Sequence, residues 1–255
     1  MKETYINLPV PTTIALLSDS HNMVPDPVFR SLEKHRPGMI LMAGDIVCGE
    51  KGEEDGHILQ RQKNVLPLLE FCANKAPTFL SWGNHDRCLG PEDIKQIEKT
   101  KIHVLDNSYV SVLVNDQPVV IGGLTSAWIT DYRERSKKTG IPVYMLKKKG
   151  KDPIVPKYDW LSEYTAIPGY HILLSHHPEY LRYIPKEVEL VVSGHAHGGQ
   201  WQFFNRGLFA PGQGLFAKMI SGVIDNRMVL SRGLSNPSRI PRINNPTEII
   251  YIVNR

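Results

Sequence analysis

Two histidines stand two residues apart in a short loop rich in glycine, His195 and His197 of the segment SGHAHGGQ. The loop follows an apolar run, residues 189–192, that has the composition of a β-strand. Paired imidazoles in such a loop can bind a metal ion, but polar surface turns use the same kinds of residue. The loop alone does not distinguish a metal site from a turn, so the other polar clusters of the chain have to be considered with it.

Four further polar clusters follow short apolar runs in the same way. The runs are TIALLS, MILMAG, TFLSW and HILLS, at residues 13–18, 39–44, 78–82 and 171–175. Each run has the length and composition of a β-strand. Ligands of α/β sheets bind beyond the carboxyl ends of the strands, so five strands lying together would bring all five clusters to one rim.

The clusters supply seven candidate metal ligands, which are Asp19, His21, Asp45, Asn84, His176, His195 and His197. Carboxylate, amide and imidazole donors suit a divalent cation of borderline or hard character, and the clusters contain no cysteine for a zinc–thiolate site. Seven donors are too many for one ion but suit two ions that share one carboxylate. Two such cations keep a positive charge after two carboxylates bind them. That charge fits a phosphate ester attacked in line by a metal-bound hydroxide.

The elements that must position these clusters alternate between strand and helix up to about residue 105, which is typical of parallel βαβ units. One helix signal begins with Asp26 as N-cap and Pro27 at the first helical position. A second covers residues 57–74, with an interruption at Pro67, and a third begins at Pro91. We therefore expect helices between the early strands.

The later part of the chain has a different pattern. Strand signals follow one another with little helix between them at residues 108–123 and 202–253, which indicates antiparallel strands. Residues 131–169 are basic and rich in proline and aromatic residues, and we interpret them as an insertion or lid. The whole chain, residues 1–255, is then one domain of the mixed α/β class, with two sheets packed together and helices outside. The segment AWITDY at 127–132 and Trp160 are expected to floor a substrate pocket or to pack in the core.

Length and composition are those of an ordinary globular protein, with 255 residues, 41% hydrophobic and 22% charged. A formal charge of +4 is too weak to indicate a nucleic acid partner. No apolar run approaches the ~20 residues of a membrane span, and the first residues lack a signal-peptide pattern, so we expect no membrane partner. Three cysteines without a CxxC pair indicate a reducing compartment, and we expect a cytoplasmic location.

Together, the five clusters resemble the motif blocks of the calcineurin-like metallophosphoesterase superfamily, in the same order. The blocks are Asp19-x-His21, Gly44-Asp45, Gly83-Asn84-His85-Asp86, His176 and Gly194-His195-x-His197. The segment GHAHGGQ, with SRG at 231–233 and NPTEI at 245–249, is similar to the bacterial YkuE/YaeI-type phosphodiesterase branch. Cys48 stands where the protein serine/threonine phosphatase branch has an acid, which argues against a phosphoprotein phosphatase.

The resemblance implies a four-layer α/β/β/α sandwich of two mixed sheets flanked by helices. It also implies two divalent cations, with Asp19, His21 and His197 at the first and Asn84, His176 and His195 at the second. Asp45 would bridge the two ions, and His85 would face the phosphate and help the leaving group depart. Mn, Fe, Zn, Ni and Co are all compatible with these donors. Glycines at 194, 198 and 199 would let the backbone pass close to the ions.

Three residues next to these blocks have alternative roles. His177 could replace His176 as a ligand, line the site or cap the helix that follows. Asp86 could orient His85 or act as a charge at a helix N-terminus. Arg232 could reach the phosphate or form a hydrogen bond to the C-terminal segment. The candidate substrate contacts are therefore Asn84, His85, His177 and Arg232, and the candidate catalytic residues are His85 and Asp86.

We predict a dinuclear-metal-dependent phosphoesterase that hydrolyses a phosphodiester of a small molecule. A phosphomonoesterase with the same site is the first alternative. A dianionic monoester would benefit from extra cationic side chains, and the blocks contain no arginine except Arg87. A non-catalytic metal-binding scaffold is the second alternative, and such a protein should have lost ligands that this chain retains.

Overall fold

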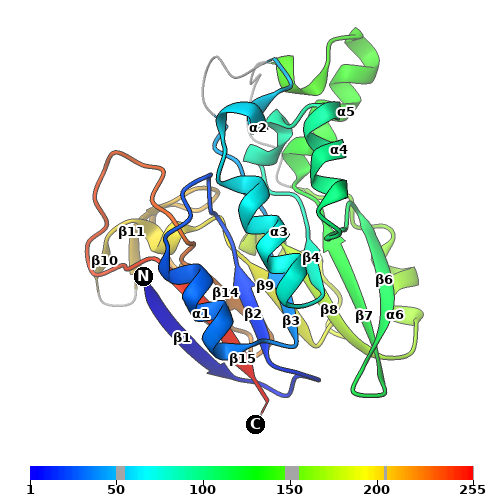
Figure 1. Ribbon diagram of the computed structural model, residues 1–255, viewed down its shortest axis with the longest axis vertical. Coiled ribbons are helices and arrows are strands. Elements are labelled where there is room, and N and C mark those ends of the chain that lie inside the picture. Colours follow the sequence, from blue (N-terminus) through cyan, green and yellow to red (C-terminus); the bar gives the residue numbers. More distant parts are fainter. Residues whose placement is uncertain (50–54, 147–154, 204–205, 255) are drawn as a thin grey trace.

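The computed structural model describes residues 1–49, 55–146, 155–203 and 206–254. Two six-stranded sheets pack face to face in its centre, and helices cover their outer faces (Figure 1). The predicted α/β class, with two mixed sheets flanked by helices, is therefore confirmed.

The first sheet has the strand order β1-β15-β2-β3-β4-β5. Its strands are β1 (Lys2–Asn7), β15 (Glu248–Val253), β2 (Ile14–Leu17), β3 (Met39–Met42), β4 (Thr78–Leu80) and β5 (His103–Val104). The strands from β2 to β5 run parallel to one another. Side chains along β2 alternate, because Leu17 packs under the helices while Leu16 packs between the two sheets. Both faces are buried, so β2 and β3 are continuous apolar runs.

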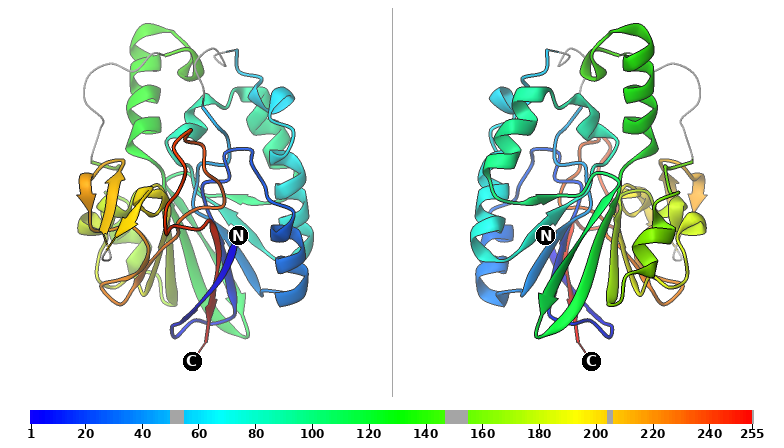
Figure 2. Two further views of the ribbon diagram at one scale, coloured as in Figure 1. Left: turned by 90° about the vertical axis from the view of Figure 1, so that its left-hand side faces the viewer. Right: turned by 90° about the vertical axis from the view of Figure 1, so that its right-hand side faces the viewer.

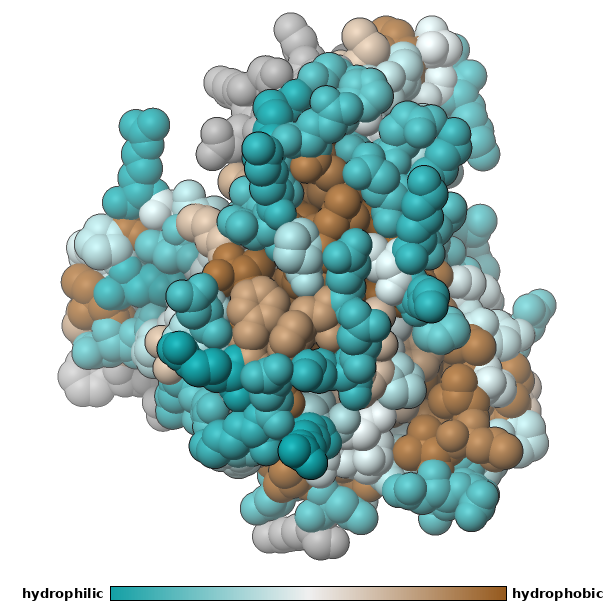
Figure 3. All heavy atoms as spheres, in the orientation of Figure 1, coloured by the Kyte–Doolittle hydropathy of each residue, from teal (hydrophilic) through white to brown (hydrophobic). Residues whose placement is uncertain are grey.

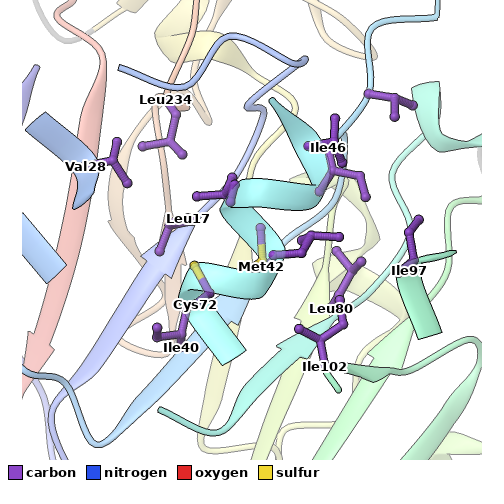
Figure 4. Close-up of a cluster of buried hydrophobic side chains, with 14 of the residues drawn as sticks. Leu17, Val28, Ile40, Met42, Ile46, Cys72, Leu80, Ile97, Ile102 and Leu234 are labelled. Atoms are coloured by element: carbon purple, nitrogen blue, oxygen red, sulfur yellow. The ribbon is translucent and has the colours of Figure 1, made fainter. Parts of the chain in front are cut away.

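Helices cover the outer face of the first sheet. They are α1 (Pro27–His35), α2 (Ile58–Arg61), α3 (Val65–Lys75) and α4 (Pro91–Lys99). Figure 4 shows Val28 of α1, Cys72 of α3 and Ile97 of α4 in one cluster with Leu17 and Met42 of the sheet. Because this cluster lies behind β2, β3 and β4, it fixes the positions of the loops that follow them.

The second sheet has the strand order β13-β14-β9-β8-β7-β6. Its strands are β13 (Gly222–Ile224), β14 (Met228–Leu230), β9 (Leu190–Ser193), β8 (Tyr170–Ser175), β7 (Gln117–Leu124) and β6 (Ser108–Val114). The helix α6 (Leu161–Ala166) and the 3-10 helix η3 (Pro178–Tyr183) pack on its outer face through Tyr164 and Tyr180. A separate three-stranded sheet consists of β10 (Gln202–Phe203), β11 (Arg206–Ala210) and β12 (Gly214–Ala217).

The helical region 57–74 breaks at a different place from the predicted one. The break lies between α2 and α3, and Pro67 lies in the first turn of α3. The amides of a first helical turn have no intrahelical acceptor, so proline costs little there. The start of α1 at Pro27 agrees with prediction, but Asp26 makes no side-chain cap hydrogen bond.

Strand directions in the C-terminal part agree only partly with prediction. The pairs β6–β7 and β13–β14 are antiparallel as expected. However, β14 is parallel to β9 and β15 is parallel to β1. The chain between β9 and β14 is long enough to return to the same end of the sheet, which permits a parallel pair. The N-terminal strand β1 was not predicted.

The predicted insertion at 131–169 contains most of α5 (Ala127–Thr139), the 3-10 helix η2 (Val143–Met145) and α6. In Figure 2, α5 projects beyond the ends of the two sheets. The basic run KKKGK at 147–151 lies outside the described residues. The role of the whole insertion, residues 131–169, as a lid stays a prediction. None of the helices in the described ranges is long and apolar enough to cross a membrane.

Candidate metal centre

The five polar clusters lie in the loops that follow β2, β3, β4, β8 and β9. Backbone hydrogen bonds join neighbouring loops, from the Asp19 amide to Gly44 O at 3.0 Å and from the Gly194 amide to His176 O at 3.0 Å. The two sheets are also joined at this rim, because the His195 amide donates to both carboxylate oxygens of Asp19 at 3.1 Å. The loops of both sheets therefore converge on one place.

Among the described residues, four overlapping groups of three side chains hold ligand atoms within 4.8 Å of one another. Two of them consist of predicted ligands alone, the first group with Asp19, His21 and His197 and the second group with Asp45, His176 and His195. The other two are His21 with Asp45 and His85, and His177 with Glu179 and His195. Asp45 of the second group also lies close to the first. Its Oδ2 is 3.8 Å from Nε2 of His21 and 3.1 Å from Nε2 of His176. Asn84 lines the same cavity, and its buried Oδ1 has no hydrogen-bond partner in the part of the chain that is described. All seven predicted ligands are thus brought together.

The donors of the first group fit a divalent cation. Nδ1 of His21 lies 3.2 Å from Val47 O, so Nε2 is the free nitrogen that faces the centre. Nε2 of His21 and Nε2 of His197 are 3.3 Å apart, close to the separation expected of two nitrogens bound tetrahedrally at ~2.0–2.1 Å. Burial lowers the pKa of both histidines to about 3, so both rings are neutral and able to bind a cation.

The donors of the second group are held by similar contacts. Nδ1 of His176 donates to Ala43 O at 2.6 Å, which directs Nε2 towards Asp45. Burial disfavours the charged form of His176, but Asp45 outweighs this effect and raises its pKa to about 10. An imidazole binds metal in its neutral form, so a cation would have to displace that proton. Burial lowers the pKa of His195 well below its usual range.

Five of the seven predicted ligands have a left-handed backbone conformation. They are Asp19, His21, Asp45, His195 and His197, with φ of 51°, 43°, 54°, 68° and 46°. This conformation costs of the order of 1–3 kcal/mol for a residue with a side chain, and such residues cluster at functional sites. The surrounding fold therefore holds the donors in place at a cost in stability.

The glycines of the fifth cluster serve two different purposes. A Cβ at Gly194 would strike the Asp19 carboxylate, so the backbone passes close to the first group as expected. A Cβ at Gly198 would instead strike the Asn245 side chain, and one at Gly199 would strike the backbone of β11. Gly198 and Gly199 therefore let the loop pack against the C-terminal segment and the small sheet, which corrects their predicted role.

The loop after β4 holds Asp45 in place. Oδ1 of Asp45 accepts a hydrogen bond from the His85 amide at 2.8 Å. Asp86 accepts from the amides of Gly83, Asp45 and Ile46 at 2.7, 2.8 and 2.9 Å. Burial and the nearby Asp45 charge raise the pKa of Asp86, and the amides oppose this effect. No contact with the His85 ring, the first alternative, is among these, whereas Asp86 does lie in the first turn of the 3-10 helix η1 (His85–Cys88), as the second alternative expects. The catalytic role of Asp86 stays a prediction.

Replacing Asp86 by alanine is expected to destabilise the fold. The change leaves three buried amides without an acceptor, and each costs about 1–3 kcal/mol, so the loss should be at least about 3 kcal/mol. Urea denaturation followed by circular dichroism measures this loss. Asp55→Ala is the matched control, because its ion pair with Arg61 is exposed to solvent and contributes little to stability. Equal stability of both variants would show that the amides have other acceptors.

A cavity of about 340 Å³ opens over the two groups. Its walls include His85, Trp128, Glu179 and Arg182. Trp128 thus lies where a substrate pocket was expected, whereas Trp160 packs in the core against Tyr164. Burial raises the pKa of Glu179. Glu179 and Arg182 were not recognised from the sequence, although their position just after the fourth cluster was a usable signal.

The structure also places two other candidate residues. His177 lines the cavity, and its Nε2 lies 2.8 Å from Ser126 Oγ. It also forms a group with Glu179 and His195, so its ligand role stays a prediction. It precedes η3 without forming a side-chain cap. Arg232 donates to the Glu248 carboxylate of β15 at 2.8 Å, which is the hydrogen bond to the C-terminal segment.

Arg242 is a further residue that the sequence did not reveal. Its Nη2 lies 3.0 Å from Nδ1 of His197, the ring nitrogen that faces away from His21. No local motif marks Arg242, and only the folded C-terminal segment brings it to His197. A guanidinium only donates hydrogen bonds, so Nδ1 acts as acceptor and the His197 proton sits on Nε2. A cation at Nε2 would therefore require this pair to rearrange.

Two packed mixed sheets with metal-binding side chains at one rim are the features of a metal-dependent hydrolase, and the sequence itself matches such a family. Residues 12–199 match the family model described as calcineurin-like phosphoesterase. The chain belongs to this family, whose members are metal-dependent phosphoesterases.

Two relatives and one solved structure illustrate the similarity. The chain is 24% identical over 221 residues to the uncharacterized protein YpbG of Bacillus subtilis, covering 85% of this chain and 73% of YpbG. It is 27% identical over 195 residues to an uncharacterized metallophosphoesterase of Helicobacter pylori, covering 73% of this chain but 45% of that relative. The sulfate thiohydrolase SoxB of Thermus thermophilus superposes with a TM-score of 0.52 at 12% identity, over 89% of this chain and 53% of SoxB. The match to SoxB concerns the fold alone.

Proposed function

We propose that this chain is a phosphodiesterase that works with two divalent cations. The observation that carries the proposal is that Asp45 belongs both to a group with His21 and His85 and to a group with His176 and His195. A carboxylate shared by two donor groups is the arrangement that two-metal hydrolases use. When bound, two cations neutralise charge on the phosphoryl oxygens and make water nucleophilic at neutral pH.

Within this proposal the seven ligands hold the cations, and His85 helps the leaving group depart. The Gly49 amide donates to Nδ1 of His85 at 3.1 Å, which leaves Nε2–H as the donor of the ring. His85 lines the cavity, and we assign Nε2–H to a hydrogen bond that stabilises the charge developing on the leaving oxygen. The backbone of the same residue holds Asp45, so this donor and the shared ligand are positioned by one short loop.

The charges on the cavity wall favour a diester over a monoester. Arg182 brings one positive charge and Glu179 one carboxylate. A monoester dianion would need additional cations and would be repelled by Glu179 when that group is ionised, whereas a diester carries a single negative charge. Trp128 offers a flat apolar surface to one of the two ester groups.

Hydrolysis of two chromogenic esters tests the preference. With Mn²⁺ present, kcat/KM for bis(p-nitrophenyl) phosphate is expected to exceed that for p-nitrophenyl phosphate at least about tenfold, equivalent to ~1.4 kcal/mol. Asp45→Asn protein, purified in the same way, controls for contaminating esterases. Equal rates, or faster hydrolysis of the monoester, would contradict the proposal and favour a phosphomonoesterase.

Three finer expectations are part of the same proposal. We assign the chain to the YkuE/YaeI-type branch because of its SRG and NPTEI segments. We expect a single domain and a cytoplasmic location, because the three cysteines of the sequence include no CxxC pair, as is usual in a reducing compartment. We also expect Mn, Fe, Zn, Ni or Co as the bound metals, because the donors are oxygen and imidazole nitrogen.

A further inference from the structure

The small sheet of β10, β11 and β12 stands out from the side of the two main sheets (Figures 1 and 2). Apolar side chains on this sheet and on the nearby C-terminal segment are exposed to solvent. We call them the hairpin patch, which consists of Phe203, Leu208, Phe209, Leu215, Phe216 and Ile240. Figure 3 shows hydrophobic atoms gathered at the edge of the molecule where Figure 1 labels β10 and β11.

The hairpin patch is too exposed to contribute much to the core. Leu215 is 68% exposed and Phe216 is 65% exposed. Phe209 lies directly opposite Leu215 in the sheet, so these side chains form a continuous apolar surface. Single exposed apolar residues are ordinary, but a contiguous group on a projecting hairpin indicates a contact surface.

The charge of the surrounding chain indicates what kind of partner this is. Between residues 190 and 247 there are six lysines and arginines and one carboxylate, that of Asp225. Three of the arginines are held within the fold, Arg227 and Arg242 by backbone oxygens and Arg232 by Glu248. The other three cationic side chains, Arg206, Lys218 and Arg239, are exposed, and each is within two residues of a patch member in the sequence. Apolar side chains surrounded by cations are complementary to an anionic lipid surface.

The hairpin patch also lies near the candidate metal centre. An apolar cavity of about 380 Å³ is lined by Leu208, Phe209 and Ile240 of the patch and by Trp201. His197, one of the predicted ligands, lines both this cavity and the one over the metal centre. A lipid that met the patch would therefore lie next to the wall of the metal centre.

We propose that the hairpin patch binds the surface of a membrane containing anionic phospholipids. The apolar tips enter the headgroup region, and Arg206, Lys218 and Arg239 lie against lipid phosphates. The sequence led us to expect no membrane partner because it has no spanning run, but contact with a membrane surface needs no such run. If the proposed function also holds, this contact brings phosphodiester headgroups close to the metal centre.

Vesicle flotation with the full chain tests the proposal. The protein is expected to float with phosphatidylcholine vesicles that contain phosphatidylglycerol, and to bind much less to vesicles of phosphatidylcholine alone. High salt should weaken the binding because it screens the cationic side chains. Replacing Leu215 and Phe216 together by serine should weaken binding at least about tenfold, since two exposed apolar side chains are removed.

The matched control is Leu113→Ser, because Leu113 is 75% exposed but lies on β6 at the edge of the second main sheet. It should bind vesicles as the wild type does. All variants should hydrolyse soluble bis(p-nitrophenyl) phosphate at the wild-type rate, which separates a failure of membrane binding from a failure of the proposed function. The proposal is overturned if the wild type does not float, or if the double variant floats equally well. It is also overturned if the wild type is a dimer, the double variant is a monomer and both bind vesicles equally. The patch would then be the contact between two copies of the chain.

Discussion

Replacing Asp45 by asparagine is expected to lower the affinity for divalent cations by more than about 100-fold. Groups that only support a ligand are worth about 10–100-fold in affinity, and Asp45 offers oxygens both to a group with His21 and to a group with His176. Asparagine keeps an oxygen that can accept from the His85 amide, so the loop is expected to stay folded. Calorimetric titration with Mn²⁺ measures the affinity, and hydrolysis of a phosphodiester should be lost in parallel.

The control for this variant is Asp93→Asn. Asp93 is also fully buried, and it accepts hydrogen bonds from the amides of Ile58, Leu59 and Gly90. This change should lower stability but leave the cation affinity of the folded protein unaltered. If Asp45→Asn bound Mn²⁺ as tightly as the wild type, Asp45 would not be a shared ligand.

Replacing His85 by alanine is expected to lower kcat by roughly 10²–10⁴-fold while both cations stay bound. The ring is lost, and with it the proton held on Nε2, but the backbone amide that holds Asp45 remains. His103→Ala is a suitable control, because His103 stacks on Phe79 at the edge of the first sheet. Its rate should match that of the wild type.

Two other results would change the role of His85. Unaltered kcat in His85→Ala would mean that the leaving oxygen does not depend on this ring. Loss of cation binding would instead make His85 a ligand, since it also forms a group with His21 and Asp45. Measuring Mn²⁺ affinity alongside kcat distinguishes the two.

Strands that are buried on both faces were predicted correctly, because burial requires an unbroken run of apolar residues. β2, β3 and β9 are buried on both sides, so their sequences are unbroken apolar runs. By contrast, β1 is half exposed and pairs with β15, which lies more than 240 residues further along the chain. Such a strand has neither a strong local pattern nor a nearby partner, so it was missed.

The same distinction applies to the candidate site. Residue types and motif order predicted the donors, because a metal site needs particular side chains in loops after strands. The orientation of each ring depends on distant backbone, such as Val47 O for His21 and Ala43 O for His176. Arg242 reaches His197 from the C-terminal segment, which no local pattern indicates. These contacts arise from tertiary structure and could be found only there.

The most direct test of the account is X-ray diffraction from crystals grown with Mn²⁺, recorded at the manganese absorption edge. We expect two anomalous peaks about 3.5–4 Å apart, both in contact with Asp45. One should touch His21 and the other His176. A single peak, or manganese bound away from these residues, would contradict the claim that the two donor groups hold a pair of cations.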